Sequence, residues 1–165
     1  MSGAVLVAGI GNIFLGDDGF GVEVANRLGQ RMAHPGVRVV DFGIRGVHLA
    51  YELLDGYQAL ILIDAVPLGE VAGTVAVIQP GSRGLEPSGQ GALDAHSMSP
   101  DVVLATLARL GGRVEHVYVV GCQPANLDEG IGLSPPVAAA VDTAVEVCCQ
   151  LVAEMVEPVG KGTGQ

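Results

Sequence analysis

Two aspartates and one histidine, far apart along the chain, carry the side chains best suited to chemistry. Asp18 closes a glycine-rich segment, Asp64 directly follows the apolar run 59–63, and His96 lies in a long polar segment. Two carboxylates and one imidazole form an incomplete ligand set, which suits a divalent transition metal such as nickel or zinc and leaves positions for water or substrate. The chain has no local metal motif such as H-E-x-x-H, and a metal already held by a partner protein would fit these ligands equally well.

Each of these residues also has an ordinary structural explanation. Asp64 would serve as a turn cap at the end of its strand, and a single loop histidine such as His96 is often exposed or hydrogen-bonded locally. Asp17, the neighbour of Asp18, fits the N-cap of the helix that follows, where a carboxylate accepts hydrogen bonds from free backbone N–H groups. In that case one acid of the pair caps the helix while the other faces a cleft.

The glycine-rich segment 9–21 is expected to connect the first strand to the first helix. An apolar run, 4–8, precedes it, and residues 22–28 carry apolar side chains at helical spacing. Phe14 stands where the dinucleotide-binding fingerprint needs its third glycine, and no Walker motif follows. Because two acids at the end of the loop would repel a phosphate, the loop is expected to serve a cation or a helix start.

Strand and helix patterns alternate along the rest of the chain. Strands are predicted at 37–42, 59–63, 74–78 and 114–120, and helices at 47–54, 99–110 and 134–156. The connection before 74–78 is too short for a helical crossover, so this strand is expected to run antiparallel to its predecessor, at or near a sheet edge. The predicted fold is α/β: a three-layer α/β/α sandwich whose twisted, mostly parallel sheet has about five strands. Residues 1–157 are expected to form a single domain and 158–165 a flexible tail.

The acidic residues that end strands are expected to meet at one rim of this sheet. Sites in open α/β sheets form beyond the carboxyl ends of the strands, at a topological switch point. Asp41 ends the second predicted strand, as Asp64 ends the third. Carboxylates gathered there repel one another, so a cation, a protonated histidine or hydrogen-bond donors must offset the repulsion.

Charge and composition limit the classes of partner and the compartment that we expect. The formal net charge of −10 argues against a nucleic acid or an anionic membrane as partner. No secretory signal is evident at the start, and no stretch approaches the roughly 20 apolar residues that cross a bilayer. The three cysteines show no CxxC spacing, which predicts neither a disulfide framework nor a zinc site. The simplest expectation is a soluble, reduced, cytoplasmic protein.

The motifs, taken in order, resemble those of the [NiFe]-hydrogenase maturation endopeptidases over nearly the whole chain. The matching residues are Gly9-Ile10-Gly11-Asn12, Asp17-Asp18-Gly19-Phe20-Gly21, Asp41-Phe42-Gly43-Ile44-Arg45-Gly46, Asp64-Ala65, His96 and Gly121-Cys122-Gln123-Pro124. The resemblance implies an endopeptidase that removes the C-terminal extension of a hydrogenase large-subunit precursor after nickel has been inserted. It implies that the nickel is carried by the precursor and that other divalent transition metals can substitute.

The resemblance also implies residue roles. Asp18, Asp64 and His96 correspond to the family's metal-binding and catalytic residues, which would support metal-assisted peptide hydrolysis. Asp18 stands where some relatives have glutamate, so the donor type is kept on a shorter arm. Asp41 and Gly43, together with Gly46, match a second segment beside the cleft, implied to bind and select the substrate.

Two other functions fit the same residues. A cysteine peptidase would use Cys122 with His96 and an aspartate, although the sequence around Cys122 gives no nucleophile context and favours a buried small-residue role. A non-catalytic nickel-sensing assembly chaperone would need the same three ligands as the peptidase. The sequence indicates no oligomeric state.

Overall fold

The predicted strands and helices are present in the computed structural model, which describes residues 4–80 and 99–156. The elements in chain order are β1 (Ala4–Ile10), the 3-10 helix η1 (Gly16–Gly19), α1 (Phe20–Arg31), β2 (Val37–Gly43), α2 (Gly46–Leu53), β3 (Tyr57–Ala65), β4 (Val75–Ile78), α4 (Pro100–Arg109), β5 (His116–Cys122) and α5 (Pro135–Met155). The predicted tail 158–165 lies outside the described residues, and the extent of the domain stays a prediction.

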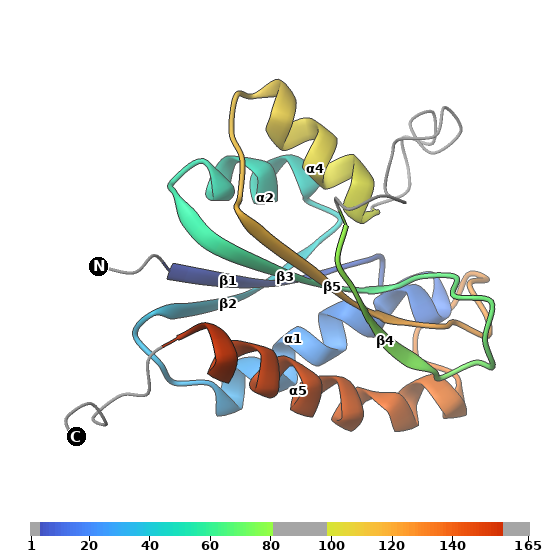
Figure 1. The fold of residues 1–165 in the computed structure, drawn as a ribbon. Helices are drawn as coiled ribbons and strands as arrows, with labels where there is room; N and C mark the ends of the chain where they lie inside the picture. Colours follow the sequence, from blue (N-terminus) through green and yellow to red (C-terminus); the bar gives the residue numbers. More distant parts are fainter. Residues whose placement is uncertain (1–3, 81–98, 157–165) are drawn as a thin grey trace, which may run out of the picture.

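A single five-stranded sheet forms the middle layer, in the order β2-β1-β3-β5-β4 (Figure 1). The pairs β1–β2, β1–β3 and β3–β5 are parallel, and β4 is antiparallel to β5 at one edge. The predicted antiparallel edge strand is therefore confirmed. Its pairing partner is β5 rather than β3, because β5 lies between them.

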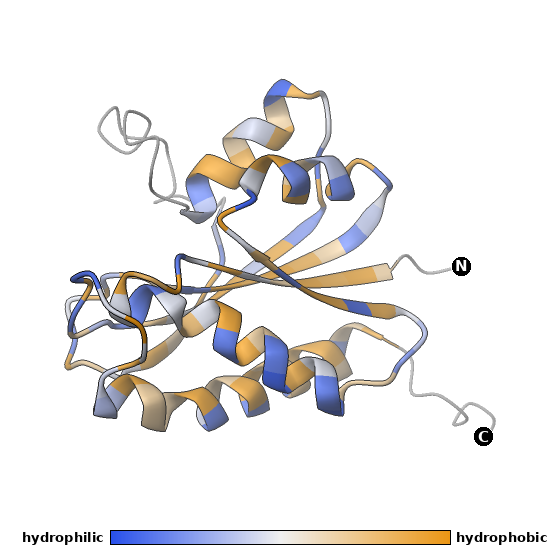
Figure 2. Ribbon diagram, turned by 180° about the vertical axis from the view of Figure 1, so that it is seen from behind, coloured by the Kyte–Doolittle hydropathy of each residue, from blue (hydrophilic) through white to orange (hydrophobic). Residues whose placement is uncertain are grey.

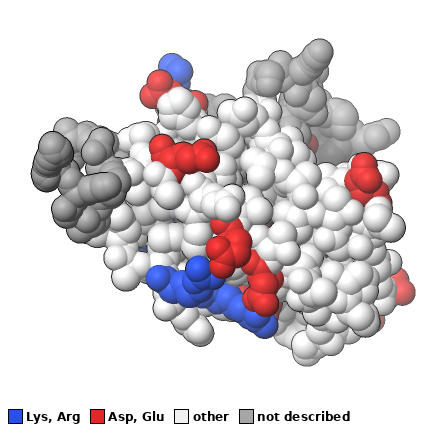
Figure 3. All heavy atoms as spheres, turned by 60° about the horizontal axis from the view of Figure 1, so that its bottom comes forward, with Lys and Arg blue, Asp and Glu red and all other residues white. Residues whose placement is uncertain are grey.

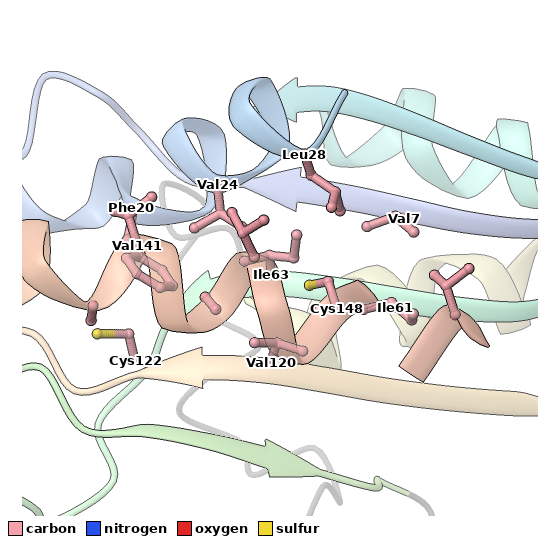
Figure 4. Packing of buried hydrophobic residues seen from close by; sticks show 14 of the residues in the cluster. Val7, Phe20, Val24, Leu28, Ile61, Ile63, Val120, Cys122, Val141 and Cys148 are labelled. Carbon is pink, nitrogen blue, oxygen red and sulfur yellow. The ribbon is translucent and has the colours of Figure 1, made fainter. Parts of the chain in front are cut away.

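Helices cover both faces of the sheet, which confirms the three-layer sandwich. Helices α1 and α5 pack together on one face, and α2 and α4 pack together on the other. Side chains of β3 alternate between the two cores. Ile61 and Ile63 face α1 and α5 (Figure 4). Leu60 and Leu62 face α2 and α4 on the opposite side of the sheet. Figure 2 shows the resulting apolar colour along the central strands. This two-sided burial explains why 59–63 is uninterruptedly apolar.

Helix α5 is long and apolar enough to cross a membrane by length and composition, which the sequence analysis did not anticipate. Its position explains this composition without a membrane. Val141, Val145 and Cys148 are buried against the sheet as part of the core (Figure 4). We therefore assign α5 as a core helix.

The outer surfaces of α1 and α5 are joined by ion pairs. Arg27 lies 3.0 Å from Asp142, and Arg31 lies 2.9 Å from Glu146. Figure 3 shows this face, with basic and acidic side chains side by side. Exposed pairs of this kind contribute little to stability. They do pair the arginines of α1 with acids, so these arginines do not form an unopposed basic patch for a nucleic-acid backbone.

The topological switch point lies between β1 and β3. The chain leaves β1 through α1 to reach β2 on one side, and it returns through α2 to β3 on the other. Because β1 and β3 are parallel, with Gly9 opposite Ile63, their carboxyl ends adjoin. The first place to look for a site is therefore the loop after β1 and the last residues of β3.

Candidate active site

Glycines allow the loop after β1 to fold tightly against the sheet. Gly11 has a φ of +135°, and a Cβ there would overlap the backbone carbonyl of Asp18. A Cβ on Gly21 would overlap the carbonyl oxygens of Ile10 and Ile63. The glycines of the motif thus let η1 and the start of α1 approach the ends of β1 and β3. This close approach brings Asp18 to the switch point.

Asp64 is a buried carboxylate with an unused oxygen. It is 2 % exposed at the end of β3, and its Oδ1 has no hydrogen-bond partner among the described residues. Burial raises the pKa of Asp64 well above its usual range, and the negative charge of Asp18 raises it further; the backbone N–H of Ala65 opposes this in part. A buried, unpaired carboxylate is costly, so its presence needs an explanation.

Asp18 is the half-buried neighbour of Asp64. Its Oδ2 accepts a hydrogen bond of 2.7 Å from the backbone N–H of Asn12. Burial raises the pKa of Asp18, and that hydrogen bond only partly offsets the rise. The charge of Asp18 raises the proton affinity of Asp64, and Asp64 has a free buried oxygen, so the two carboxylates fit the binding of a cation.

The structure therefore brings two of the three predicted ligands into electrostatic contact. His96, the third, lies outside the described residues, so its position relative to Asp18 and Asp64 stays a prediction. Within 4–80 and 99–156, no group of three or more histidine, cysteine, aspartate or glutamate side chains is placed to hold a metal ion. The carboxylate pair alone fits an incomplete metal site that needs a further ligand.

Asp17 has a different role from the predicted N-cap. The N-cap of α1 is Gly19, and it makes no side-chain capping bond. Asp17 instead accepts hydrogen bonds from the N–H groups of Ala125, Asn126 and Ser134 at 2.8, 2.9 and 2.7 Å, and from the Ser134 hydroxyl at 2.8 Å. Burial alone would raise its pKa, but these four bonds outweigh burial and lower it. Asp17 anchors the loop after β1 to the loop before α5.

A cleft of about 380 Å³ opens at the loop after β1; neither Asp18 nor Asp64 is among its lining residues, and Asn12, which lines it, is hydrogen-bonded to Asp18. Residues 11–14 line one side, residues 41–45 line the other, and Val22 contributes as well. Asp41 and Gly43 are thus at the cleft, as the sequence predicts, and Gly43 has a φ of +55°. Gly46, the third residue of that predicted segment, begins α2 and is not among the lining residues.

Arg45 holds the second wall of the cleft in place, a role that the sequence analysis missed. Its guanidinium donates to the carbonyl oxygens of Asp41 at 2.6 Å and Phe42 at 3.1 Å. The same group lies 5.8 Å from the centre of the Phe42 ring. The sequence signal for this role was the position of Arg45 in the motif, three residues after the predicted strand 37–42.

Cys122 is a buried core residue. Its side chain packs among the apolar residues between the sheet and α5, and its thiol contacts the Gln123 carbonyl at 3.7 Å (Figure 4). Burial raises the pKa of Cys122 to about 11, and the charge of Asp17 contributes to the rise. Because the thiolate is the nucleophile, a buried thiol with a raised pKa is unsuited to peptidase chemistry. The structural explanation of Cys122 is favoured.

Several known proteins are similar to this chain in sequence and in fold. The family model for hydrogenase maturation proteases matches residues 22–151. The hydrogenase expression/formation protein HupD of Bradyrhizobium diazoefficiens is 32% identical over 154 residues, which cover 91% of this chain and 78% of that protein. HoxM of Azotobacter vinelandii is also 32% identical over 154 residues, covering 91% and 72%.

Solved structures agree. The hydrogenase maturating endopeptidase HybD from E. coli superposes with a TM-score of 0.73 at 28% identity, over 92% of this chain and 93% of that one. A hydrogenase 2 maturation peptidase from a Thaumarchaeota archaeon gives 0.69 at 30% identity, over 90% and 97%. Sequence and fold agree over nearly the full length of the chain, which therefore belongs to the hydrogenase maturation protease family.

Proposed function

We propose that this protein removes the C-terminal extension from the large-subunit precursor of a [NiFe]-hydrogenase once nickel has been inserted into that precursor. Family membership supports the endopeptidase activity. The observation that supports a metal-dependent reaction is the free, buried Oδ1 of Asp64 beside the carboxylate of Asp18. A buried carboxylate with a purely structural role normally accepts hydrogen bonds, as Asp17 does.

The nickel is part of the substrate in this proposal, and the chain supplies ligands to it. Asp18 and Asp64 would contact the metal from the switch point, and His96 would provide a nitrogen. A bound divalent metal would polarise the scissile carbonyl or lower the pKa of a bound water. Asn12 fixes one oxygen of Asp18 through its backbone N–H, which orients the carboxylate before the precursor binds.

The cleft beside the acids is the proposed site for the precursor's C-terminal segment. Gly11 and Gly43 present backbone without side chains on its two sides, so a peptide can come close to the protein backbone. Asp41, held in the wall that Arg45 braces, would contact the substrate and contribute to selection. A requirement for both a docked C-terminal segment and an inserted metal would restrict cleavage to precursors that already contain nickel.

A cytoplasmic location is part of the proposal. Cys122, Cys148 and Cys149 are all free thiols, as expected in a reducing compartment.

The mass of the large subunit tests this function. Purified protein is incubated with precursor prepared either with or without nickel, and the mass of the large subunit is measured at intervals. We expect the extension to be lost only from nickel-loaded precursor and only when the protein is present. Stable binding without a change in mass would instead indicate an assembly chaperone. Equal cleavage of both precursors would contradict the nickel requirement.

A further inference from the structure

Asn12 occupies the position between the cleft and the acid pair. It follows Gly11 at the end of β1, it is half-buried, and it is among the residues that line the cleft. Its backbone N–H donates to Oδ2 of Asp18 at 2.7 Å, so the residue is fixed relative to the acids. Asn12 therefore connects the cleft, which it lines, to Asp18, to which it is hydrogen-bonded.

The orientation of the Asn12 side chain follows from its hydrogen bonds. The backbone N–H of Phe14 donates to Asn12 Oδ1 at 2.8 Å. Only an oxygen can accept from that N–H, so the Nδ2 amino group is on the opposite side of the amide. Nothing in the described ranges accepts a hydrogen bond from Nδ2. Two N–H donors are therefore available on a side chain that cannot rotate without breaking the turn.

We propose that Nδ2 of Asn12 donates a hydrogen bond to the carbonyl oxygen of the peptide bond that is cut. This inference rests on the proposed function and extends it to a further catalytic residue. As the oxygen of water bonds to the carbonyl carbon, the π electrons of the carbonyl move onto its oxygen, which becomes negative. A fixed N–H donor stabilises that charge more than it stabilises the neutral carbonyl.

The reaction balances without any additional reactant. The C–N bond breaks as the carbonyl re-forms, the oxygen of water stays in the new carboxylate, and both protons of the water end on the departing amine. Asn12 gains and loses no proton in this sequence. Its contribution is the hydrogen bond alone, so the proposal predicts a slower chemical step when the donor is removed, with little change in precursor binding.

Asn126 provides a matched control within the same chain. Its backbone N–H donates to Oδ2 of Asp17 at 2.9 Å, and its Oδ1 accepts from the N–H of Asp128 at 2.9 Å. The two asparagines thus form the same local turn, each beside one of the adjacent aspartates. Asn126 is exposed and does not line the cleft, so only Asn12 has the position to contact the substrate.

Three substitutions at each asparagine separate the donor from the turn. Serine and aspartate keep an oxygen that accepts from the N–H two residues on. Serine lacks the amide and carries its single hydroxyl proton one bond nearer the backbone than Nδ2, aspartate replaces the donor with a charge, and alanine keeps neither donor nor acceptor. Single-turnover cleavage of nickel-loaded precursor is measured for each variant, together with precursor affinity and thermal midpoint. We expect N12S, N12D and N12A all to slow cleavage about 10²- to 10³-fold. The same three changes at Asn126 should leave the rate close to that of the unaltered protein.

Other outcomes overturn the proposal in distinguishable ways. If N12S and N12D cleave at the normal rate and only N12A is slow, Asn12 acts through the turn alone. If only N12D is slow, the effect is the added charge beside Asp18. If the unaltered protein leaves the precursor mass unchanged, the proposed function fails and this inference with it. Normal cleavage by unaltered protein alongside normal N12S refutes the inference alone.

Discussion

Asp17 and Asp64 are both buried carboxylates in the same region, yet their surroundings differ. Asp17 is 0 % exposed, and four hydrogen bonds lower its pKa. Asp64 is 2 % exposed, and burial with a nearby acid raises its pKa while one oxygen has no partner in the described structure. Burial alone therefore does not distinguish the carboxylate that anchors two loops from the one that we propose to bind the metal. The supply of hydrogen-bond donors does.

Asp18 lies between these extremes and is adjacent to Asp17 in sequence. Within the described part of the chain it accepts one hydrogen bond, from the N–H of Asn12, so part of the carboxylate remains available. Asp17 thus accepts four hydrogen bonds from described residues, whereas Asp18 accepts one. A buried carboxylate with few donors lowers the stability of the fold, and this cost is typical of functional sites. The comparison predicts opposite stability effects for substitutions at Asp17 and Asp64.

The largest stability effect is expected at Asp17. Asp17→Ala leaves two backbone N–H groups of the 125–126 segment, and the N–H and hydroxyl of Ser134, without their acceptor. Because buried donors left unpaired are costly, we expect a loss of about 3–5 kcal/mol in the free energy of unfolding, measured by urea denaturation. A loss within error of zero would mean that Asp17 does not anchor the loop before α5.

Asp64→Asn should have the opposite sign. In metal-free protein the substitution removes a buried charge, so we expect the free energy of unfolding to rise by about 1–2 kcal/mol. Chemical denaturation at neutral pH measures the change. A clear loss of stability would show that Asp64 has a structural role like that of Asp17, and the contrast between the two acids would disappear.

The pH dependence sharpens the same contrast. The lowered pKa of Asp17 contributes stability that is present above its unfolded value near 3.8 and is lost as pH falls through the folded pKa. The raised pKa of Asp64 makes stability fall as pH rises above 3.8 through its folded pKa. We therefore expect the advantage of Asp64→Asn to vanish near or below pH 3.8, and the disadvantage of Asp17→Ala to narrow only at still lower pH. Denaturation curves across this range test both; parallel pH profiles would contradict the assignment.

The smallest effect is expected at Cys122. Cys122→Ala creates a small cavity in the core beside α5, which should lower the free energy of unfolding by about 1 kcal/mol. Cleavage of the precursor should continue at a normal rate, because the thiol is buried with a pKa of about 11. If folded Cys122→Ala no longer cleaves the precursor, the cysteine-peptidase hypothesis would be supported instead.

Local patterns predicted the fold well. Alternating apolar runs and helical spacing are properties of neighbouring residues, so β3 and α5 could be located from sequence within a few positions. The switch-point rule then predicted that Asp18 and Asp64 come together. The sequence could not predict what Asp17 binds, since its partners lie 108 to 117 residues away. From sequence, a carboxylate next to a helix start predicts a local N-cap. In the structure Asp17 instead accepts hydrogen bonds from the distant segment before α5.

The sequence predicted those site residues that lie near the ends of strands, and it missed the others. Asp41 was placed at the cleft because it lies near the carboxyl end of β2, next to β1, which is a consequence of sheet order. The positioning roles of Asn12 and Arg45 were missed because they depend on main-chain hydrogen bonds, donated by the Asn12 N–H and accepted by the Asp41 carbonyl, which a residue type alone does not specify. His96 remains a prediction from the family resemblance.

Cleavage of nickel-loaded precursor by Asp64→Asn, compared with Asp55→Asn as the control, tests the central claim most directly. Asp55 is exposed and precedes β3, whereas Asp64 is buried near its carboxyl end, so both variants lose one charge close to the same strand. We predict that Asp64→Asn stays folded and leaves the large-subunit mass unchanged while Asp55→Asn processes it normally. Normal processing by folded Asp64→Asn would contradict the account.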